Sequence, residues 1–440
     1  MQICRGGYSS MRVPLRFLSE VFTVVVLFLS TGAFLSLVID VSNPDTQTHG
    51  STGLQLVWSC IYVLAALRAL ARYREIVWFL RSNKLLTLLL ALAVLSTLWS
   101  GDPGLTFRRS IAVLATTLFG IDFALRYSIQ EQLRRLCFVL GLAVLLSVIV
   151  QVCWPGLIPV VNATSAAEGW NGAFPQKNMF ARVIVLTALA FLMRSSGRRR
   201  LFKNGLVICC AFALIGAAQA RTALVVLLAL LFLWAGSRFL LSARHPGLVW
   251  LVGVVTGLPI LYLASTNLEY LTGILGRNST LTGRVGIWHM AFASFLKRPL
   301  LGYGYSGFWN VSSEALKINS ALHWTVPHAH NGFLDLALQL GLAGLCLYLT
   351  YYVIVVRRAV EYARSNSSAE AMWPLAYLAF SFLYSFTESS PLTSNSMSWI
   401  LYISVAYSVA AASAFHPAEP ETAVAVAELT PGPQLNRGEI

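Results

Sequence analysis

The segment TVPHAHNGFLDLALQLG, residues 325–341, places several polar side chains at the start of an otherwise apolar helix. Asn331, Asp335 and Gln339 recur every four residues, so one stripe of this helix is polar and must face the interior of a bundle or a water-filled cleft. His330 stands at the mouth of the helix. An unperturbed histidine titrates near about 6.5 and can accept a proton at neutral pH. We therefore take His330 as the candidate general base and Asn331 as a candidate substrate contact.

Two arginines elsewhere in the chain are candidates for binding a phosphate group. Arg221 lies in AAQARTALVV, between two apolar runs, and Arg284 lies in TGRVGIW at the first turn of a predicted helix. A guanidinium group stays charged and forks bidentately onto phosphate, and a helix N-terminus also favours an anion. The alternatives are an arginine that anchors the helix end by snorkelling, for Arg221, and a solvated surface charge, for Arg284.

Further polar residues mark the same side of the predicted bundle. We interpret them as candidate substrate contacts, although snorkelling is favoured for the arginine pair and a helix-end carboxylate remains open for the acidic residue. They are Arg108 and Arg109 in FRRSIAV, Lys177, Asn178 and Arg182 in FPQKNMFAR, and Glu388 in SFTESSPLTS, which could orient His330 or an arginine.

The spacing His328-x-His330 also raises the question of a metal site. Zinc sites use about three or four protein ligands, and only His323 and Asp335 lie nearby in the sequence. The chain has no G-x-x-x-x-G-K-[ST] phosphate loop and no dinucleotide fingerprint. We expect neither a metal nor a nucleotide, and no other cofactor.

The elements that position these residues are membrane helices. The 440 residues are 57% hydrophobic and 11% charged, against about 25% charged in soluble domains. Windows of about 20 apolar residues predict an all-α integral membrane protein with about 12 transmembrane helices. These lie near 17–39, 53–70, 84–100, 108–127, 133–153, 177–194, 204–219, 221–241, 247–265, 331–356, 372–390 and 397–415.

The formal charge of +14 follows from topology. Most lysines and arginines fall in the tails and in alternate loops, which by the positive-inside rule places both termini in the cytoplasm. The charge is therefore no sign of a nucleic-acid partner, and the candidate residues share the opposite, periplasmic side.

One loop is long enough to form a subdomain. Residues 266–330 are rich in aromatics, and TLTGRVGIWHMAFASFLKRP reads as an amphipathic helix with Trp288 on its apolar face and Pro299 at its end. We treat Trp288 as a further candidate substrate contact. The predicted organisation is a cytoplasmic N-terminus (1–16), a first bundle (17–265), a large periplasmic loop (266–330), a second bundle (331–415) and a disordered cytoplasmic tail (416–440).

Arginines and a histidine on one side of the membrane, without a metal or nucleotide motif, suit transfer of a group from a diphosphate-activated membrane donor. Cations stabilise the leaving diphosphate, and a base or acceptor orients the incoming hydroxyl.

The chain also resembles a known family. His330 and Asn331, nine residues, then Gly341 and Gly344 match the pattern of the O-antigen ligase and polysaccharide polymerase superfamily. WNGAFPQKNMFAR, QARTAL, TGRVGIW, RPLLGYGYSGFW, HAHNGFLDL and FTESS together resemble the ExoQ-like exopolysaccharide polymerases.

The resemblance implies an inverting glycosyltransferase of the bacterial inner membrane. Its donor would be an oligosaccharide on undecaprenyl diphosphate, with His330 activating the acceptor hydroxyl and Arg221 and Arg284 holding the diphosphate. A chain-length regulator and export machinery would be possible partners beside membrane lipid. Polymerase is favoured, an O-antigen ligase acting on a lipid A core or other acceptor is the alternative, and a solute transporter is disfavoured because no repeated halves are visible.

Overall fold

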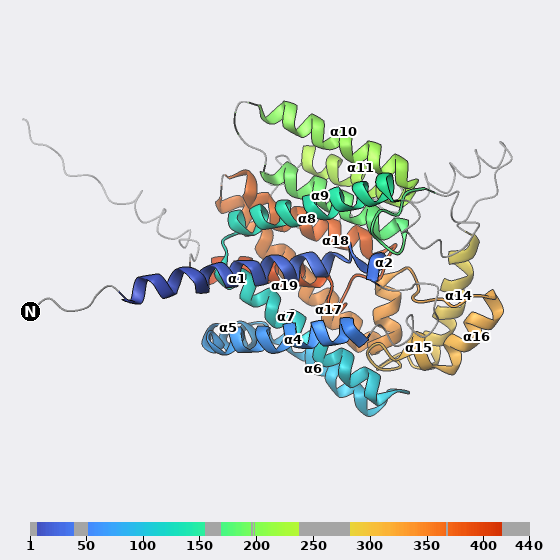
Figure 1. The fold of residues 1–440 in the computed structure, drawn as a ribbon. Coiled ribbons are helices and arrows are strands. Elements are labelled where there is room, and N and C mark those ends of the chain that lie inside the picture. The colour runs from blue at the N-terminus through green and yellow to red at the C-terminus, as the bar shows by residue number, and fades with distance from the viewer. Residues whose placement is uncertain are drawn as a thin grey trace, which may run out of the picture.

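The computed structural model describes residues 7–38, 52–154, 169–194, 197, 199–236, 282–366 and 368–415, and within these the regular structure is entirely helical (Figure 1). The predicted span at 247–265 and the tail 416–440 lie outside the described residues. The helices are α1 (Gly7–Thr31), α2 (Leu35–Val38), α4 (Thr52–Leu70), α5 (Tyr73–Ser82), α6 (Lys84–Leu95), α7 (Pro103–Arg126), α8 (Ile129–Cys153), α9 (Lys177–Arg194), α10 (Arg200–Ala218), α11 (Arg221–Ala235), α14 (Thr282–Lys297), α15 (Phe308–Val311), α16 (Ser313–Leu322), α17 (Gly332–Ser365), α18 (Trp373–Ser385) and α19 (Met397–Phe415), with short 3-10 turns at Ser96–Leu98 and Ala369–Met372.

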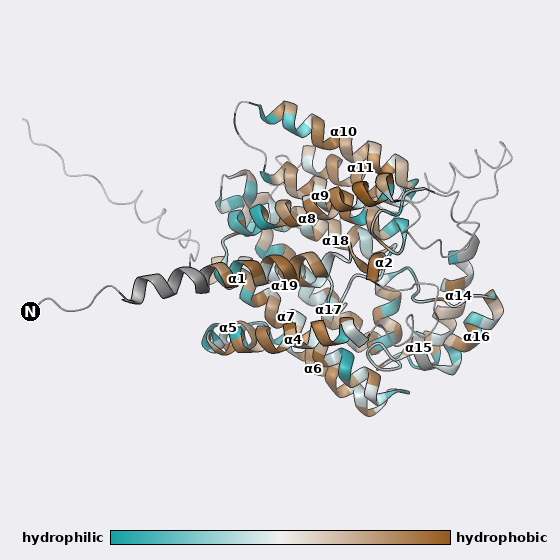
Figure 2. Cartoon of the chain, in the orientation of Figure 1, coloured by the Kyte–Doolittle hydropathy of each residue, from teal (hydrophilic) through white to brown (hydrophobic). Residues whose placement is uncertain are grey.

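The bundle is organised around α17 and α19. α19 packs against α7 and α17, α17 packs against α6 and α18, and α9 packs against α8, α10, α11 and α18. Most residues of these helices are apolar, and hydrophilic residues gather toward helix ends such as the start of α10 (Figure 2). This distribution suits a protein whose surface faces lipid, because apolar side chains remain exposed on the outer helices.

The predicted number of twelve membrane helices is not confirmed. Five described helices, α4, α8, α10, α17 and α19, are long and apolar enough to cross a membrane, and α5 with α6 would make a sixth across a bend of 98°. Helices do occur at the predicted spans 108–127, 177–194 and 372–390, but α7 and α9 carry several charged residues and α18 has only 13 residues. Neighbouring helices cover much of the surface of α7, α9 and α18. Such covered helices need a less apolar sequence than a helix that is surrounded by lipid.

One helix of the bundle is broken where the sequence predicts a continuous span. In α17 the backbone of Gly341 takes φ +66° and ψ −167°, which is not helical. A Cβ there would lie 2.1 Å from the carbonyl oxygen of Leu300, so this position requires glycine.

The segment 299–304 supplies the hydrogen bonds that the break removes from α17. The amides of Tyr303 and Gly304 donate to the carbonyls of Leu338 and Gln339 at 2.8 and 2.9 Å, and the amide of Leu342 donates to the carbonyl of Pro299 at 2.8 Å. These groups of α17 thereby find backbone partners outside the helix. The pairing fixes the segment after α14 directly onto α17.

Helices α14, α15 and α16 form a subdomain at one end of the bundle, on the right in Figure 1. Ile287, Ala291 and Phe295 of α14 pack with Phe308 and Ile318 in a core separate from that of the bundle. This end also receives the first turn of α7, because the Thr106 hydroxyl donates to the Tyr305 carbonyl at 3.0 Å.

A cluster of charged residues lies toward the other end of α7. The buried Asp122 accepts from Arg68 Nε at 2.9 Å and from Arg126 Nε at 2.7 Å. Two guanidinium groups satisfy one carboxylate, so this cluster is explained by structure and needs no ligand. At about 1.5 Å of rise per residue, Asp122 lies roughly 24 Å along α7 from Thr106, which contacts Tyr305.

Candidate active site

The predicted base lies in a short turn, residues 327–331, which we call the histidine turn. It connects the α14–α16 subdomain to α17, and Asn331 begins α17 by accepting hydrogen bonds from the amides of Phe333 and Leu334, both at 3.1 Å. His330 adopts φ +50°, in the left-handed region. That conformation is costly for a residue with a Cβ and persists only where the surroundings fix it.

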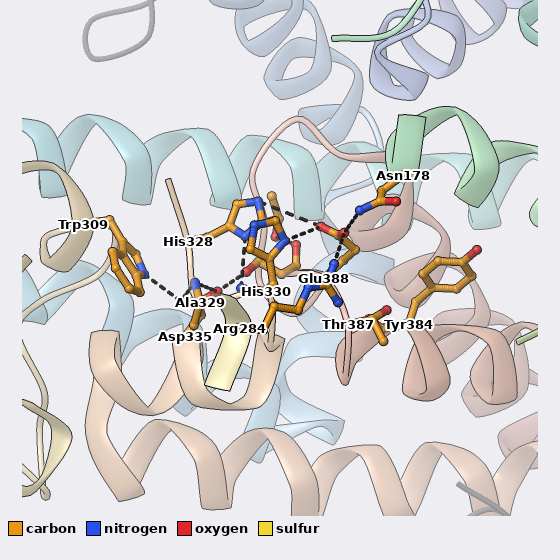
Figure 3. Close-up of polar contacts among 12 residues, drawn as sticks. Asn178, Arg284, Trp309, His328, Ala329, His330, Asp335, Tyr384, Thr387 and Glu388 are labelled. Carbon is orange, nitrogen blue, oxygen red and sulfur yellow. Dashed lines mark hydrogen bonds and ion pairs between the residues drawn. The ribbon is translucent and has the colours of Figure 1, made fainter. Parts of the chain in front are cut away.

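Glu388 stands at the centre of the site (Figure 3). It lies in the segment 386–396 between α18 and α19, which we call the acidic loop. Its Oε2 is 3.6 Å from His330 Nδ1 and 3.9 Å from His328 Nε2, and its Oε1 is 3.9 Å from Arg284 Nη2. Asn178 Nδ2 donates to Oε1 at 3.3 Å. One carboxylate therefore contacts four of the side chains around it.

The charge of Glu388 is set by these neighbours. The carboxylate is buried, which opposes ionisation, but His330, His328 and Arg182 favour the charged form and lower the pKa of Glu388 to about 2. Glu388 is thus an anion at neutral pH. The sequence analysis suggested that it could orient His330 or an arginine, and it lies beside both.

His328 is a neutral member of the site. Burial and the neighbouring His330 lower the pKa of His328 to about 4. Its Nδ1 accepts a hydrogen bond from the His330 amide at 3.2 Å, which leaves the proton on Nε2, toward Glu388. The two imidazole rings lie edge to face with centroids 4.1 Å apart.

The two ring nitrogens of His330 have different surroundings. Its Nδ1 is buried without a hydrogen-bond partner among the described residues and faces the carboxylate of Glu388. Nε2 lies on the opposite edge of the imidazole ring. A carboxylate beside Nδ1 with Nε2 left free is the arrangement in which a histidine accepts a proton from a hydroxyl.

Three residues that the sequence predicts to bind substrate or donor diphosphate lie around Glu388. Arg284 comes from α14, and Asn178 and Arg182 come from the first turns of α9. Arg182 acts electrostatically on both His328 and Glu388. The structure thus brings together residues from α9, α14, the histidine turn and the acidic loop.

Trp288 and Asn331 are in this region but have structural partners. The indole Nε1 of Trp288 donates to the Ala329 carbonyl at 2.8 Å, and the Asn331 side-chain oxygen caps α17. Both hold the histidine turn in place. Of the two surroundings expected for the polar stripe of α17, the structure shows the protein interior: Asp335 is buried, and Gln339 Oε1 accepts from the Ser306 amide at 2.9 Å.

Arg108 and Arg109 lie in a second polar group, on α7. Arg108 is exposed and donates to Gln55 Oε1 at 3.4 Å. Arg109 acts electrostatically on the hydroxyls of Tyr62 and Tyr305. The Tyr305 hydroxyl donates to the carbonyl of Leu392 at 2.5 Å, so the acidic loop connects this group to Glu388.

The remaining predicted cations begin helices. Lys177 is the first residue of α9, and Arg221 is the first residue of α11. α11 packs against α9 and α18, the helices that carry Asn178 and lead into the acidic loop. Both cations therefore belong to helices around the site.

The structure adds a third potential metal ligand that the sequence analysis missed. Nitrogen or oxygen atoms of His328, His330 and Glu388 lie within 4.8 Å of one another, whereas the sequence places only His323 and Asp335 near the two histidines. Glu388 is distant in sequence, so spacing alone gave no signal for it. Arg284 and Arg182 stand beside the trio, and their charges oppose a divalent cation there.

Comparison with known proteins shows which families the chain resembles. Residues 205–349 match the profile of a family described as O-antigen ligase. Over 368 residues the chain is 23% identical to the exopolysaccharide production protein ExoQ of Rhizobium meliloti (strain 1021), which covers 79% of this chain and 80% of that protein. A 90-residue stretch, 20% of this chain and 22% of the relative, is 34% identical to a protein of Rickettsia felis named "Putative polysaccharide ligase". These similarities support an O-antigen ligase/ExoQ-like family for the chain, and its described helices are those of a multi-pass membrane protein.

Proposed function

We propose that the protein is a membrane glycosyltransferase that polymerises oligosaccharide repeat units carried on undecaprenyl diphosphate. It would act at the periplasmic face of the bacterial inner membrane, with both termini in the cytoplasm. The observation that carries this proposal is the contact of Glu388 with His330 at 3.6 Å and with Arg284 at 3.9 Å. It joins a base to an anion-binding cation in one buried site.

His330 would act on the acceptor. Glu388 orients the imidazole through Nδ1, and Nε2 takes the proton from the acceptor sugar hydroxyl. The hydroxyl oxygen forms a bond to the anomeric carbon of the donor while the bond from that carbon to the diphosphate oxygen breaks. The electron pair leaves with undecaprenyl diphosphate, and the displacement inverts the anomeric centre.

The cations would act on the donor. Arg284 and Arg182 lie at the site, and Lys177 and Arg221 begin helices around it. As the glycosidic bond breaks, negative charge grows on the diphosphate, and arginines held in a buried site stabilise that charge more strongly than water does. The activated donor supplies the driving force, so neither a nucleotide nor a metal is needed.

A polymerase must also bind a second lipid-linked substrate. Arg108 and Arg109, with Tyr62 and Tyr305, form a cationic and polar group connected to Glu388 through the acidic loop. We assign this group to the acceptor diphosphate. The periplasmic partners would be a chain-length regulator and export machinery.

Ligation is the second candidate. The match of residues 205–349 to the O-antigen ligase profile favours it, while the similarity to ExoQ over 79% of the chain favours polymerisation. The site chemistry is the same in both, and only the acceptor differs: a second repeat unit, or a lipid A core.

One experiment separates the two candidates. Purified protein in lipid nanodiscs is given an undecaprenyl-diphosphate repeat unit alone, and the products are resolved by mass. A ladder of longer lipid-linked glycans supports polymerisation. Product formed only after a separate acceptor is added supports ligation, and no reaction with any lipid-linked donor would contradict the proposal.

A further inference from the structure

Asp335 has no role in the mechanism above, yet its carboxylate connects three segments of the site. It lies in the first turn of α17 and is 2% exposed. It accepts from the indole Nε1 of Trp309 on α15 at 2.6 Å, from the Ala329 amide in the histidine turn at 3.0 Å, and from the Ser389 hydroxyl in the acidic loop. Figure 3 shows Asp335 between Trp309 and the histidine turn.

Two of the residues that donate to Asp335 are sequence neighbours of the reacting groups. Ala329 directly precedes His330, and Ser389 directly follows Glu388. One buried carboxylate thus holds the residues next to both members of the His330–Glu388 pair. A small shift of either segment would open their 3.6 Å contact.

The histidine turn needs such support because its backbone is strained. His330 is in the left-handed region at φ +50°, a conformation that the surroundings must enforce. The peptide groups of Ala329 are held on both sides: the amide donates to Asp335, and the carbonyl accepts from Trp288 at 2.8 Å.

We propose that Asp335 is a positioning residue, whose carboxylate fixes the histidine turn and the acidic loop at the spacing that brings His330 and Glu388 together. This inference rests on the proposed function for its role in catalysis, but not for its structural content. Both oxygens of Asp335 already accept hydrogen bonds from protein donors, so it acts through its neighbours and not on substrate.

Two substitutions separate geometry from charge. In Asp335→Asn, the amide oxygen can still accept from Trp309 and Ala329, and the amide nitrogen can donate to Ser389 once that hydroxyl rotates. In Asp335→Leu, the side chain keeps the branching at Cγ, becomes larger and loses all three bonds. We expect kcat to stay within about 10-fold of wild type in Asp335→Asn and to fall about 100-fold or more in Asp335→Leu. KM for the donor should change by less than about threefold, because the arginines remain.

The matched control is Asn319→Leu. Asn319 Oδ1 also accepts from a backbone amide of the same connection, that of Val326, at 2.9 Å, but it does not adjoin His330 or Glu388. We expect it to retain wild-type kcat. If Asp335→Leu does not fold, the pair Ser389→Ala with Trp309→Phe removes two of the three bonds and should lower kcat in the same way.

A second readout does not depend on activity. The rate at which diethyl pyrocarbonate modifies His330, followed by peptide mass spectrometry, should rise several-fold in Asp335→Leu and stay unchanged in Asp335→Asn and Asn319→Leu. If wild type transfers no glycan, the proposed function fails while this labelling still decides the role of Asp335. Wild-type kcat and unchanged labelling in Asp335→Leu would overturn the inference, as would an inactive Asp335→Asn in which His330 remains protected.

Discussion

Substitution of Glu388 by glutamine should separate catalysis from donor binding. Glutamine keeps the size of the side chain and its hydrogen bond with Asn178, but it removes the negative charge beside His330 and Arg284. Without a carboxylate at Nδ1, the imidazole loses both its orientation and the stabilisation of its protonated form. We expect kcat to fall by about 100- to 1,000-fold, in line with the contribution of a positioned base.

Donor binding should not weaken in Glu388→Gln. Two unit charges 3.9 Å apart, the distance from Glu388 Oε1 to Arg284 Nη2, attract by about 4 kcal/mol at an effective dielectric constant of about 20. Part of this attraction is offset by solvent, because the Arg284 side chain is 21% exposed. Loss of the carboxylate leaves Arg284 free for the diphosphate, so KM for the donor should stay the same or fall.

The assay is steady-state turnover of a lipid-linked repeat unit in nanodiscs, with the donor concentration varied. Glu314→Gln is the matched control, because Glu314 also pairs with two cations, Lys297 and Lys317, but on the surface of α16. Its turnover should equal that of wild type. A Glu388→Gln enzyme with wild-type kcat, or with a raised KM and an unchanged kcat, would refute the assignment of Glu388 as the partner of His330.

Three further predictions follow from the structure. The pKa of His328 is about 4 in the folded protein and about 6.5 in the unfolded chain. Between those pH values only the unfolded chain gains this proton, so the stability of the protein should fall as the pH is lowered through this range. His328→Asn should therefore lose less Tm than wild type between about pH 7 and pH 5. Gly341→Ala, whose added Cβ would meet the Leu300 carbonyl at 2.1 Å, should lower Tm and the yield of folded protein, whereas Gly205→Ala, with open space around it, should not; equal Tm values would contradict the account of the helix break. Chelation with EDTA should leave turnover unchanged because arginines flank the histidines, and activity restored by one divalent ion after its loss would instead assign His328, His330 and Glu388 to a metal.

The local pattern of the chain predicted its helices well. Apolar runs and terminal signals are properties of neighbouring residues, so the described helices coincide with eleven of the twelve predicted spans, and α14 begins at Thr282 and ends at Lys297, before Pro299. The number of membrane-crossing helices was not predictable in the same way. Charged residues in α7 and the shortness of α18 are accommodated by packing partners that a hydropathy window does not see.

The site was likewise predictable only in part. The histidine turn was recognised from its own residues, but its contacts come from segments far apart in the sequence, since Asn178 and Glu388 are separated by 210 residues. The break at Gly341 likewise depends on pairing with the segment 299–304. Neither spacing nor composition contains this information, and for that reason the sequence places Asp335 only in the polar stripe of its own helix and does not show its bonds to two loops.

The most direct test of the account compares two histidines in one enzyme. Single-turnover release of undecaprenyl diphosphate, coupled to growth of the glycan, would be measured for wild type, His330→Ala and His323→Ala; His323 is an exposed residue that ends α16. The account predicts that His330→Ala slows the transfer by about 100-fold or more while still binding the donor, and that His323→Ala transfers at the wild-type rate. Transfer at the wild-type rate by His330→Ala would contradict the account.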